Sequence, residues 1–295
     1  MISKKLIFKG SATALVTPFK NGKIDFVAFE RLIDFQLSNL TSAIVVLGTT
    51  GESPTIRDDE RTEILKFAKD KIAGKVPLIA GTGSNSTHHA IKLTENAEKI
   101  GADACLSVTP YYNKATTQGL KIHYKEIAKS TSLPIIMYNV PSRTGMNLSC
   151  ETLYELTDVK NIVAIKEASG NVSEIEQKIA KFKDYFWFYS GCDELILPIY
   201  SLGGVGVISA VSNVFPSEIS TLCSLFEKKC LSEAQNLAIN LSPAIKELFA
   251  EVNPIPVKAT LSLMGLCENE LRLPLCPSTR GDKIKENVLS VLKKG

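Results

Sequence analysis

Short apolar runs alternate with longer amphipathic stretches along most of the chain. Eight runs rich in β-branched residues are typical of strands, over 12–17, 43–48, 76–81, 104–109, 134–139, 162–166, 186–190 and 205–209. Between them, apolar side chains recur at helical spacing, as at Phe26, Phe29, Ile33, Leu37 and Leu40, and again at Ile64, Leu65, Ala68 and Ile72. This alternation predicts βα units that build a parallel sheet covered by helices.

The number of units indicates how the sheet is arranged. Eight units spaced by roughly thirty residues favour an α/β fold of the (β/α)8 TIM barrel type over a doubly wound open sheet. The strand signals end near residue 210, and residues 216–294 are predicted to be all helix. We therefore expect a barrel over 1–215 and a C-terminal helical extension over 216–295 that packs on the side of the barrel, with no linker between them.

Composition narrows the class of protein. Of the 295 residues, 34 are basic and 31 acidic, and the two signs are scattered, so no nucleic-acid partner is indicated. No apolar run approaches a membrane span, and the amino terminus lacks a signal-peptide core, so no membrane partner is expected. Seven cysteines without a Cys-x-x-Cys pair predict reduced thiols and a cytoplasmic location.

Lys166 stands at the end of the apolar run 162–166. Burial disfavours the ammonium form of a lysine and lowers its pKa, and a neutral amine attacks a ketone to form a Schiff base. Most lysines instead pack their stems and extend their charged ends to solvent, and this segment alone leaves that alternative open.

The carboxyl ends of the other strands carry side chains suited to carbonyl chemistry without a metal. In a barrel these ends meet at one face, where the active site is found. Strand two ends at Thr49 and Thr50, strand four is followed by Tyr112, and strand five presents Tyr138 and Arg143. Each residue also has an ordinary explanation: a half-buried aromatic, a turn, a solvated arginine. Together with Lys166 they favour a catalytic site.

Several of these segments resemble motifs of the dihydrodipicolinate synthase and N-acetylneuraminate lyase superfamily. The similar segments are 48–52 (GTTGE), 138–145 (YNVPSRTG) and 165–168 (IKEA), in the same order and spacing. In the tail, 253–258 (NPIPVK) and 271–274 (LRLP) resemble the 4-hydroxy-tetrahydrodipicolinate synthases in particular. The resemblance covers nearly the whole chain.

The resemblance implies that Lys166 forms an imine with pyruvate, and that the derived enamine attacks L-aspartate-4-semialdehyde. It implies no separate cofactor. Tyr138 would carry protons through Thr49 and through Tyr112 of a neighbouring subunit, so a homo-oligomer is implied, expected to be a tetramer built from tight dimers. The substrate-binding residues would be Thr50 for the pyruvate carboxylate, Arg143 for the semialdehyde carboxylate, and the backbone carbonyls of Gly191 and Ile208.

The resemblance also implies a possible allosteric site. Lysine-inhibited relatives bind lysine at positions equivalent to Ser53, Pro54, Asp58, Arg61, Asn85, His89 and Tyr111. This chain has Asp58 where inhibited enzymes have histidine, and His89 where they have glutamate. An imidazole lacks the fixed negative charge that pairs with the amino groups of lysine, so we expect weak or absent inhibition.

Two alternative functions stay open. One is an N-acetylneuraminate lyase or a 2-keto-3-deoxy sugar acid aldolase, which would use the same lysine but needs hydroxyl-binding groups where Arg143 stands. The other is a keto-acid sensor or scaffold without turnover. Glu167 is expected to be a structural charge, and the adjacent pair His88 and His89 is not expected to bind a metal. His123 is expected on a surface helix without a chemical role.

Overall fold

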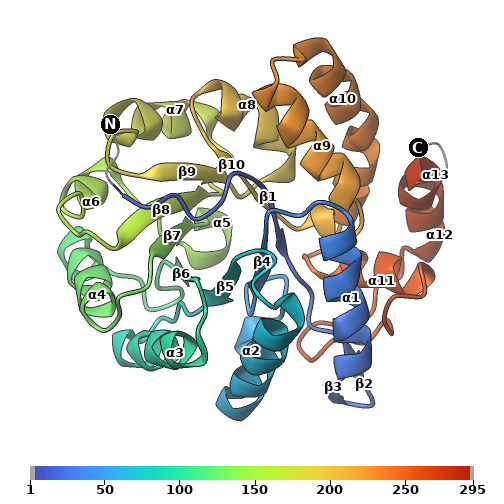
Figure 1. Ribbon diagram of the computed structural model, residues 1–295, viewed down its shortest axis with the longest axis horizontal. Helices are drawn as coiled ribbons and strands as arrows, with labels where there is room; N and C mark the ends of the chain where they lie inside the picture. Colours follow the sequence, from blue (N-terminus) through green and yellow to red (C-terminus); the bar gives the residue numbers. More distant parts are fainter. Residues whose placement is uncertain (1–3, 293–295) are drawn as a thin grey trace.

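The computed structural model describes residues 4–292, and a ring of helices encloses a closed sheet (Figure 1). The eight parallel barrel strands follow the order β1-β10-β9-β8-β7-β6-β5-β4. Their bounds are β1 Gly10–Ala14, β4 Ala43–Val46, β5 Leu78–Gly81, β6 Ala104–Val108, β7 Ile135–Asn139, β8 Ile162–Glu167, β9 Trp187–Ser190 and β10 Gly206–Ser209. Closure of the sheet between β1 and both β4 and β10 confirms the predicted (β/α)8 barrel and excludes the open sheet.

Helices of the outer ring follow the strands in order. They are α1 Phe26–Ser38, α2 Asp58–Ile72, α3 Thr87–Ile100, α4 Thr117–Lys129, α6 Cys150–Tyr154, α7 Val172–Phe182, α8 Ile196–Ser201 and α9 Pro216–Glu227. Short side chains begin several of them: Asp25, Thr116 and Asn171 each accept a hydrogen bond from a backbone N–H of the first turn. Short one-turn elements also follow strands, namely α5 Pro141–Thr144 and the 3₁₀ turns η1 Ser53–Thr55, η2 Asp193–Leu195 and η3 Val211–Asn213.

Alternation along the strands separates two cores. On β7, Ile135 and Met137 pack against the helices, whereas Ile136 and Tyr138 face the barrel interior. Successive side chains of a strand point to opposite faces, so a residue's position in the strand decides which core it joins. Lys166 pairs in register with Tyr138, which places both side chains on the interior face at the carboxyl ends of their strands.

The amino-terminal third differs from the prediction in two places. A small hairpin, β2 Phe19–Lys20 with β3 Lys23–Ile24, was not predicted, because strands of two residues carry no periodic signal. Leu40 was assigned to the apolar face of the first helix, and this is wrong. Helix α1 ends at Ser38, and Leu40 lies beyond it, 74% exposed with a φ of 63°.

The C-terminal extension is helical only in part. It contains α10 Leu231–Leu248, α11 Ile255–Leu263, α12 Gly281–Ile284, the π-helix η4 Lys285–Leu289 and α13 Ser290–Leu292. Residues 264–280 form neither helix nor strand, so the prediction of an all-helical tail is wrong there. The tail lies on one side of the barrel, beside α9 and α1 (Figure 1). Helix α9 itself completes the outer ring against β1, and the domain boundary at residue 215 stays a prediction.

Ion pairs attach the C-terminal extension to the loop after β4 and to the first turn of α2. Lys258 Nζ lies 2.5 Å from Glu52 Oε1, and both side chains are fully withdrawn from solvent. Arg272 donates its backbone N–H to Glu52 and two guanidinium hydrogen bonds to Glu60, at 2.6 and 2.7 Å. A bidentate arginine–carboxylate pair fixes geometry as well as charge. The tail therefore holds the loop that carries Thr49 and Thr50.

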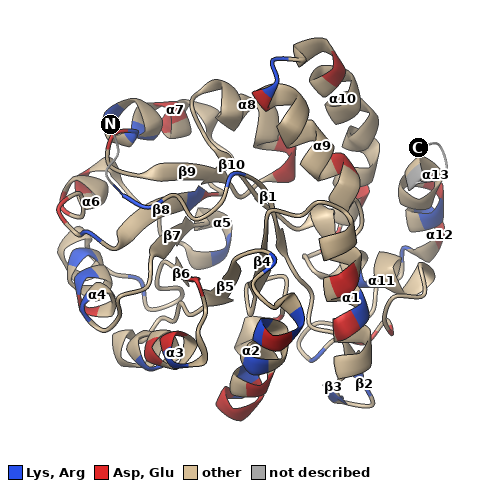
Figure 2. Cartoon of the chain, in the orientation of Figure 1, with Lys and Arg blue, Asp and Glu red and all other residues tan. Residues whose placement is uncertain are grey.

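Charged side chains of both signs are intermixed over the outer helices, as the sequence predicted (Figure 2). Within residues 4–292, no helix combines the length and apolar character that a membrane crossing requires. All seven cysteines are free in the structure, and their reduced state in the cell stays a prediction.

Candidate active site

Two adjoining cavities open at the carboxyl ends of the strands. The lysine pocket has a volume of about 210 Å³ and is lined by Thr49, Thr50, Tyr138, Val140, Ser142, Arg143, Lys166, Ala168, Gly191, Cys192, Glu194, Ile208, Ala210, Phe249 and Asn253. The Arg61 pocket has a volume of about 370 Å³ and contains Ser53, Asp58, Arg61, His89 and Tyr111 in its wall. Both pockets share Thr49, Tyr138, Val140 and Arg143. The site predicted from strand ends is therefore a real cavity.

Lys166 lies within the lysine pocket on β8 and is only 6% exposed. Burial lowers the pKa of its amine to about 8, an effect that attraction to the Asp193 carboxylate opposes and repulsion from the nearby Arg143 reinforces. At pH 7 a pKa of 8 leaves about one amine in ten uncharged, against about one in three thousand for an ordinary lysine. The predicted desolvated amine is present, and the solvent-exposed alternative is excluded.

Tyr138 lies directly beside this amine. The Nζ of Lys166 is 4.4 Å from the centre of the Tyr138 ring. Burial raises the pKa of the Tyr138 hydroxyl to about 12, while the positive charge of Arg143 and a hydrogen bond with Thr49 act in the opposite direction. The phenol therefore keeps its proton at neutral pH, and Thr49, which lines the same pocket, offers a second hydroxyl that can accept and donate protons.

Gly191 supplies the space that Lys166 occupies. A Cβ atom at Gly191 would lie 3.0 Å from Lys166 Cε and 2.7 Å from Ala168 Cβ. Its backbone N–H donates to the carbonyl of Glu167 at 2.7 Å, which holds the turn after β9 against the end of β8. The small residue thus permits close packing of two neighbouring strand ends around the amine.

Two candidate carboxylate-binding side chains meet at one residue of the tail. Thr50 is buried, and its Oγ1 accepts a hydrogen bond of 2.9 Å from Asn253 Nδ2. Arg143, on α5, donates from Nη2 to the backbone carbonyl of Asn253 at 3.2 Å. Ile208, the last of the predicted binding residues, is fully buried on β10 and lines the same pocket.

Cys192 and Asn253 line the lysine pocket, and Asp193 follows Cys192 in the chain; none of the three had a predicted role. The Asp193 carboxylate is buried and accepts hydrogen bonds from Ser209 and from the backbone N–H groups of Ala210 and Val211. Burial raises its pKa to about 6. Burial likewise raises the pKa of the Cys192 thiol to about 12, which keeps it neutral. The position of Asp193 three residues after the end of β9 was a usable signal, because catalytic residues gather at strand ends.

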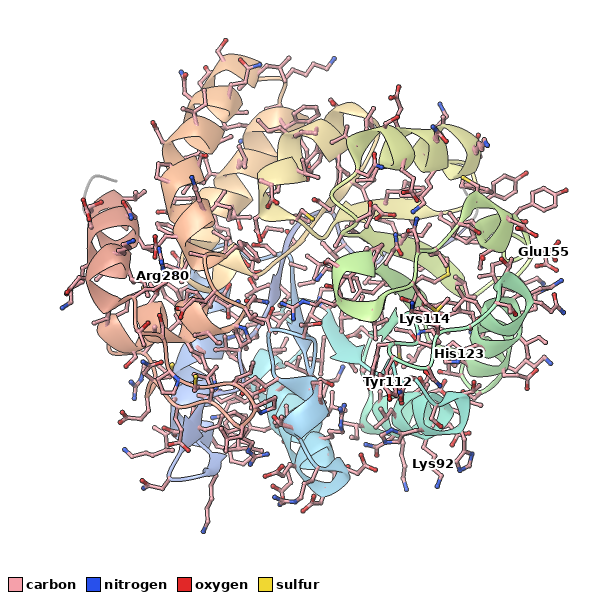
Figure 3. All side chains as sticks on the ribbon, turned by 180° about the vertical axis from the view of Figure 1, so that it is seen from behind. Lys92, Tyr112, Lys114, His123, Glu155 and Arg280 are labelled. Atoms are coloured by element: carbon pink, nitrogen blue, oxygen red, sulfur yellow. The ribbon has the colours of Figure 1, made fainter. Side chains whose placement is uncertain are left out.

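Tyr112 is not brought to the pocket of its own chain. Its side chain is 92% exposed and its backbone has a φ of 67°. Figure 3 shows it on the loop between β6 and α4, in the same region as Lys114. The prediction that a neighbouring subunit receives this tyrosine stays a prediction.

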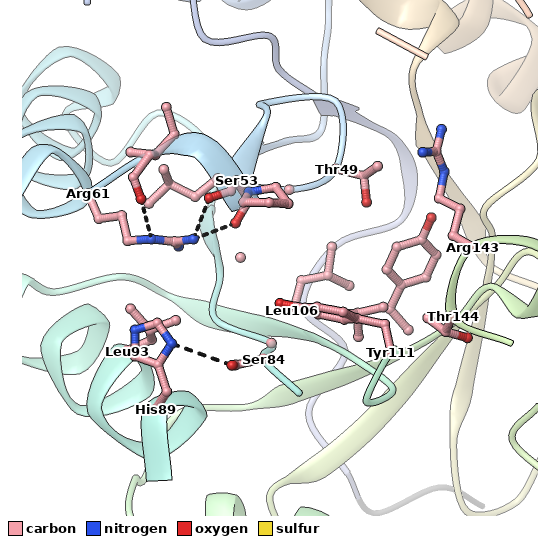
Figure 4. A pocket seen from close by; sticks show the side chains of 18 of the residues that line it. Thr49, Ser53, Arg61, Ser84, His89, Leu93, Leu106, Tyr111, Arg143 and Thr144 are labelled. Carbon is pink, nitrogen blue, oxygen red and sulfur yellow. Dashed lines mark hydrogen bonds between the residues drawn. The ribbon is translucent and has the colours of Figure 1, made fainter. Parts of the chain in front are cut away.

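Six of the seven predicted allosteric residues line the Arg61 pocket: Ser53, Pro54, Asp58, Arg61, His89 and Tyr111. Asn85 lies near it, and its backbone carbonyl accepts from Asn113. Figure 4 shows Arg61 and His89 on one side of this pocket and Thr49 and Arg143 on the other. Arg61 donates to Ser53 at 2.6 and 2.7 Å, and His89 Nε2 lies 3.3 Å from Asp58. Six of the seven residues therefore border one cavity, and its role as a lysine site stays a prediction.

The remaining candidate residues, Glu167, His123 and His88, do not line the lysine pocket or the Arg61 pocket. Glu167 points away from the pocket and forms a buried ion pair with Lys178, as predicted for a structural charge. His123 is on α4, as predicted, but on its buried face, where it contacts Thr87 and burial lowers its pKa to about 4. His88 and His89 belong to no cluster of metal-binding side chains among residues 4–292.

The fold and the pocket define a (β/α)8 barrel with a desolvated lysine beside a protonated phenol at the carboxyl ends of its strands. Comparison of the sequence with known proteins identifies the family of this barrel. The model of the dihydrodipicolinate synthetase family matches residues 7–294. The chain belongs to that family.

Similar proteins agree over almost the whole length. The 4-hydroxy-tetrahydrodipicolinate synthase of Alkaliphilus oremlandii is 50% identical over 271 residues, which are 92% of this chain and 93% of that protein. The crystal structure of dihydrodipicolinate synthase from Thermotoga maritima has a TM-score of 0.94 and 45% identity, covering 98% of this chain and 99% of that one. The chloride-inhibited enzyme of Acinetobacter baumannii, solved with pyruvate, has a TM-score of 0.93 and 41% identity, covering 97% and 99%.

Proposed function

We propose that the protein condenses pyruvate with L-aspartate-4-semialdehyde to 4-hydroxy-tetrahydrodipicolinate, through an imine on Lys166. The observation that carries this proposal is the buried amine at the end of β8, with a lowered pKa and the Tyr138 ring 4.4 Å away. Such an amine is reactive toward a keto acid without a metal. Family membership and the names of the similar proteins support the same reaction.

The first half-reaction forms the imine. The neutral Lys166 amine attacks C2 of pyruvate, and the former carbonyl oxygen takes up protons and leaves as water. Tyr138 delivers and removes these protons, with Thr49 as the next hydroxyl in line. Thr50 donates to the pyruvate carboxylate. Loss of a proton from C3 then converts the iminium into an enamine.

The second half-reaction joins the two substrates. The enamine carbon attacks the aldehyde carbon, and the aldehyde oxygen takes a proton to become a hydroxyl group. The amino group of the semialdehyde then attacks the imine carbon, which closes the ring and expels the Lys166 amine, so one water is released overall. Arg143, at the mouth of the pocket, binds the semialdehyde carboxylate.

The same proposal includes association of subunits. Tyr112 is exposed and remote from its own lysine pocket, which suits a residue that completes the proton relay of a neighbouring subunit. We infer a homotetramer built from tight dimers, acting in the cytoplasm on the route to diaminopimelate and lysine.

Borohydride reduction with pyruvate tests the imine. Reduction would fix a pyruvyl group on Lys166, located by peptide mass analysis, and the Lys166→Ala variant would acquire none. Failure of the unmodified protein to form this adduct overturns the proposal. A coupled assay then compares L-aspartate-4-semialdehyde with N-acetylneuraminate and a 2-keto-3-deoxy sugar acid. We expect turnover of the semialdehyde alone, because Arg143 offers a cation where a sugar requires hydroxyl-binding groups.

A further inference from the structure

We propose that Asn253 is a positioning residue that fixes the direction of the Thr50 hydroxyl, so that this hydroxyl donates to the pyruvate carboxylate. The inference rests on the proposed function, because it assigns a role in binding the keto acid. Asn253 lies in the tail, directly before α11, and only 8% of its surface is exposed.

The hydrogen bond between the two side chains sets their polarity. Asn253 Nδ2 donates to Thr50 Oγ1 at 2.9 Å. A hydroxyl has one proton to donate, and one that accepts from an amide N–H still holds that proton. Among the residues that the structure describes, Thr50 Oγ1 has no other hydrogen-bond partner. Its proton is therefore free for a ligand in the lysine pocket, which both residues line.

The same residue also contacts the second carboxylate-binding group. The backbone carbonyl of Asn253 accepts from Arg143 Nη2 at 3.2 Å. Asn253 thus joins Thr50 on the loop after β4 to Arg143 on α5, with its side chain on one and its backbone on the other. A side-chain substitution removes only the first contact.

The other end of the amide argues against a purely structural role. Asn253 Oδ1 is buried, and within residues 4–292 it has no hydrogen-bond partner. An unpaired buried acceptor destabilises the fold, so the Oδ1 atom of Asn253 lowers the stability of the folded protein. Replacement by leucine removes that unpaired oxygen together with one hydrogen bond. A residue that only supported the fold would not be expected to leave a polar atom unpaired.

Two substitutions separate the possible roles. In Asn253→Asp, the carboxylate accepts but does not donate, so the Thr50 hydroxyl must turn its proton toward it and present lone pairs to pyruvate. The added negative charge repels the pyruvate carboxylate as well. In Asn253→Leu, the Thr50 hydroxyl loses its fixed direction but gains no repulsion. We therefore expect the half-saturating pyruvate concentration to be highest in Asn253→Asp, intermediate in Asn253→Leu and lowest in the unmodified protein.

Borohydride trapping at graded pyruvate concentrations measures this order without the second substrate. We expect half-saturation to rise about tenfold or more in Asn253→Asp and severalfold in Asn253→Leu, at unchanged thermal stability for the latter. The KM for the semialdehyde should stay within about twofold of the unmodified value in both variants, because the backbone contact with Arg143 persists. Constants are expressed per trapped site, so partly unfolded protein does not affect them.

The control is Asn236→Asp, which makes the same charge change at an exposed position on α10. It should leave half-saturation unchanged. The inference is wrong if Asn253→Asp binds pyruvate as tightly as the unmodified protein does. It is also wrong if both variants bind pyruvate more weakly only in proportion to their loss of stability. If the unmodified protein forms no adduct, the proposed function fails instead.

Discussion

Lys166 and Tyr138 occupy paired positions on adjacent strands, and the amine of one lies 4.4 Å from the ring centre of the other. Because the strands are parallel and in register, both side chains leave the sheet on the same face at the same level. The proximity of amine and phenol is therefore a property of the barrel and does not depend on a mobile loop.

Adduct formation should depend on pH through Lys166. Its pKa is lowered to about 8, so half of the amine is in the reactive neutral form near pH 8, and deprotonation is nearly complete above about pH 9. The trapping rate at low pyruvate concentration should rise through pH 7, reach its midpoint near pH 8 and level off above about pH 9. Midpoints near 10.5, the value for an ordinary lysine, would contradict this.

Asp193 should raise the midpoint of the pH profile of borohydride trapping. Its negative charge favours the ammonium form of Lys166 and so raises the pKa of the amine. Asp193→Asn removes the charge while its oxygen still accepts from Ala210 and Val211. We expect the midpoint of the trapping profile to move to lower pH, and a shift to higher pH would show that the carboxylate acts otherwise.

Tyr138→Phe should slow the reaction without unfolding the protein. The ring still packs beside Lys166, but the hydroxyl that carries protons is lost. Proton transfer by a placed side chain contributes about 10²–10⁴-fold, so trapping and turnover should both fall by that order. Circular dichroism would check the fold, and turnover within twofold of the unmodified rate would exclude the assigned role.

Gly191→Ala should displace the amine. The new methyl group would meet Lys166 Cε at 3.0 Å and Ala168 Cβ at 2.7 Å. Overpacking of this kind typically costs about 1–3 kcal/mol, and we expect adduct formation to fall sharply. Gly281→Ala is the matched control, because a Cβ there meets nothing within 4 Å. Equal adduct formation in the two variants would contradict the assigned role of Gly191.

The ion pair between Glu167 and Lys178 should matter for stability. Nζ lies 3.0 Å from Oε2, with side chains 1% and 0% exposed. Removing one partner of a buried pair costs about 3–5 kcal/mol, and Glu167→Gln should lie at the lower end because Glu174 still pairs with Lys178. Urea unfolding measures the loss. Glu176→Gln, on the exposed face of α7, should change little, and an equal loss in both variants would refute the role of burial.

Free lysine should inhibit weakly or not at all. The Arg61 pocket presents His89 beside Asp58, whereas the family resemblance implies glutamate at position 89 and histidine at position 58 in lysine-inhibited enzymes. An inhibition curve in the coupled assay checks this, and strong sub-millimolar inhibition would overturn it. The combined change Asp58→His with His89→Glu restores the pattern of inhibited relatives and should increase sensitivity to lysine.

The barrel could be predicted because each strand carries its own apolar run. Lys166 and Tyr138 were found for the same reason, since each lies at or next to the carboxyl end of such a run. The role of Asn253 could not be found this way, because its partner Thr50 lies 203 positions away in the chain. The irregular segment 264–280 was also missed, since its order comes from contacts such as that of Arg272 with Glu60 and not from a local period.

The attachment of the tail has a consequence for biosynthesis. A ribosome completes every barrel strand well before it reaches Asn253, Lys258 and Arg272, which fasten the loop bearing Thr50. During that interval the nascent chain already contains Lys166, but the contacts that position Thr50 for the keto acid have not yet formed. We therefore expect the keto-acid site to be completed only once the last segment of the chain has been synthesised.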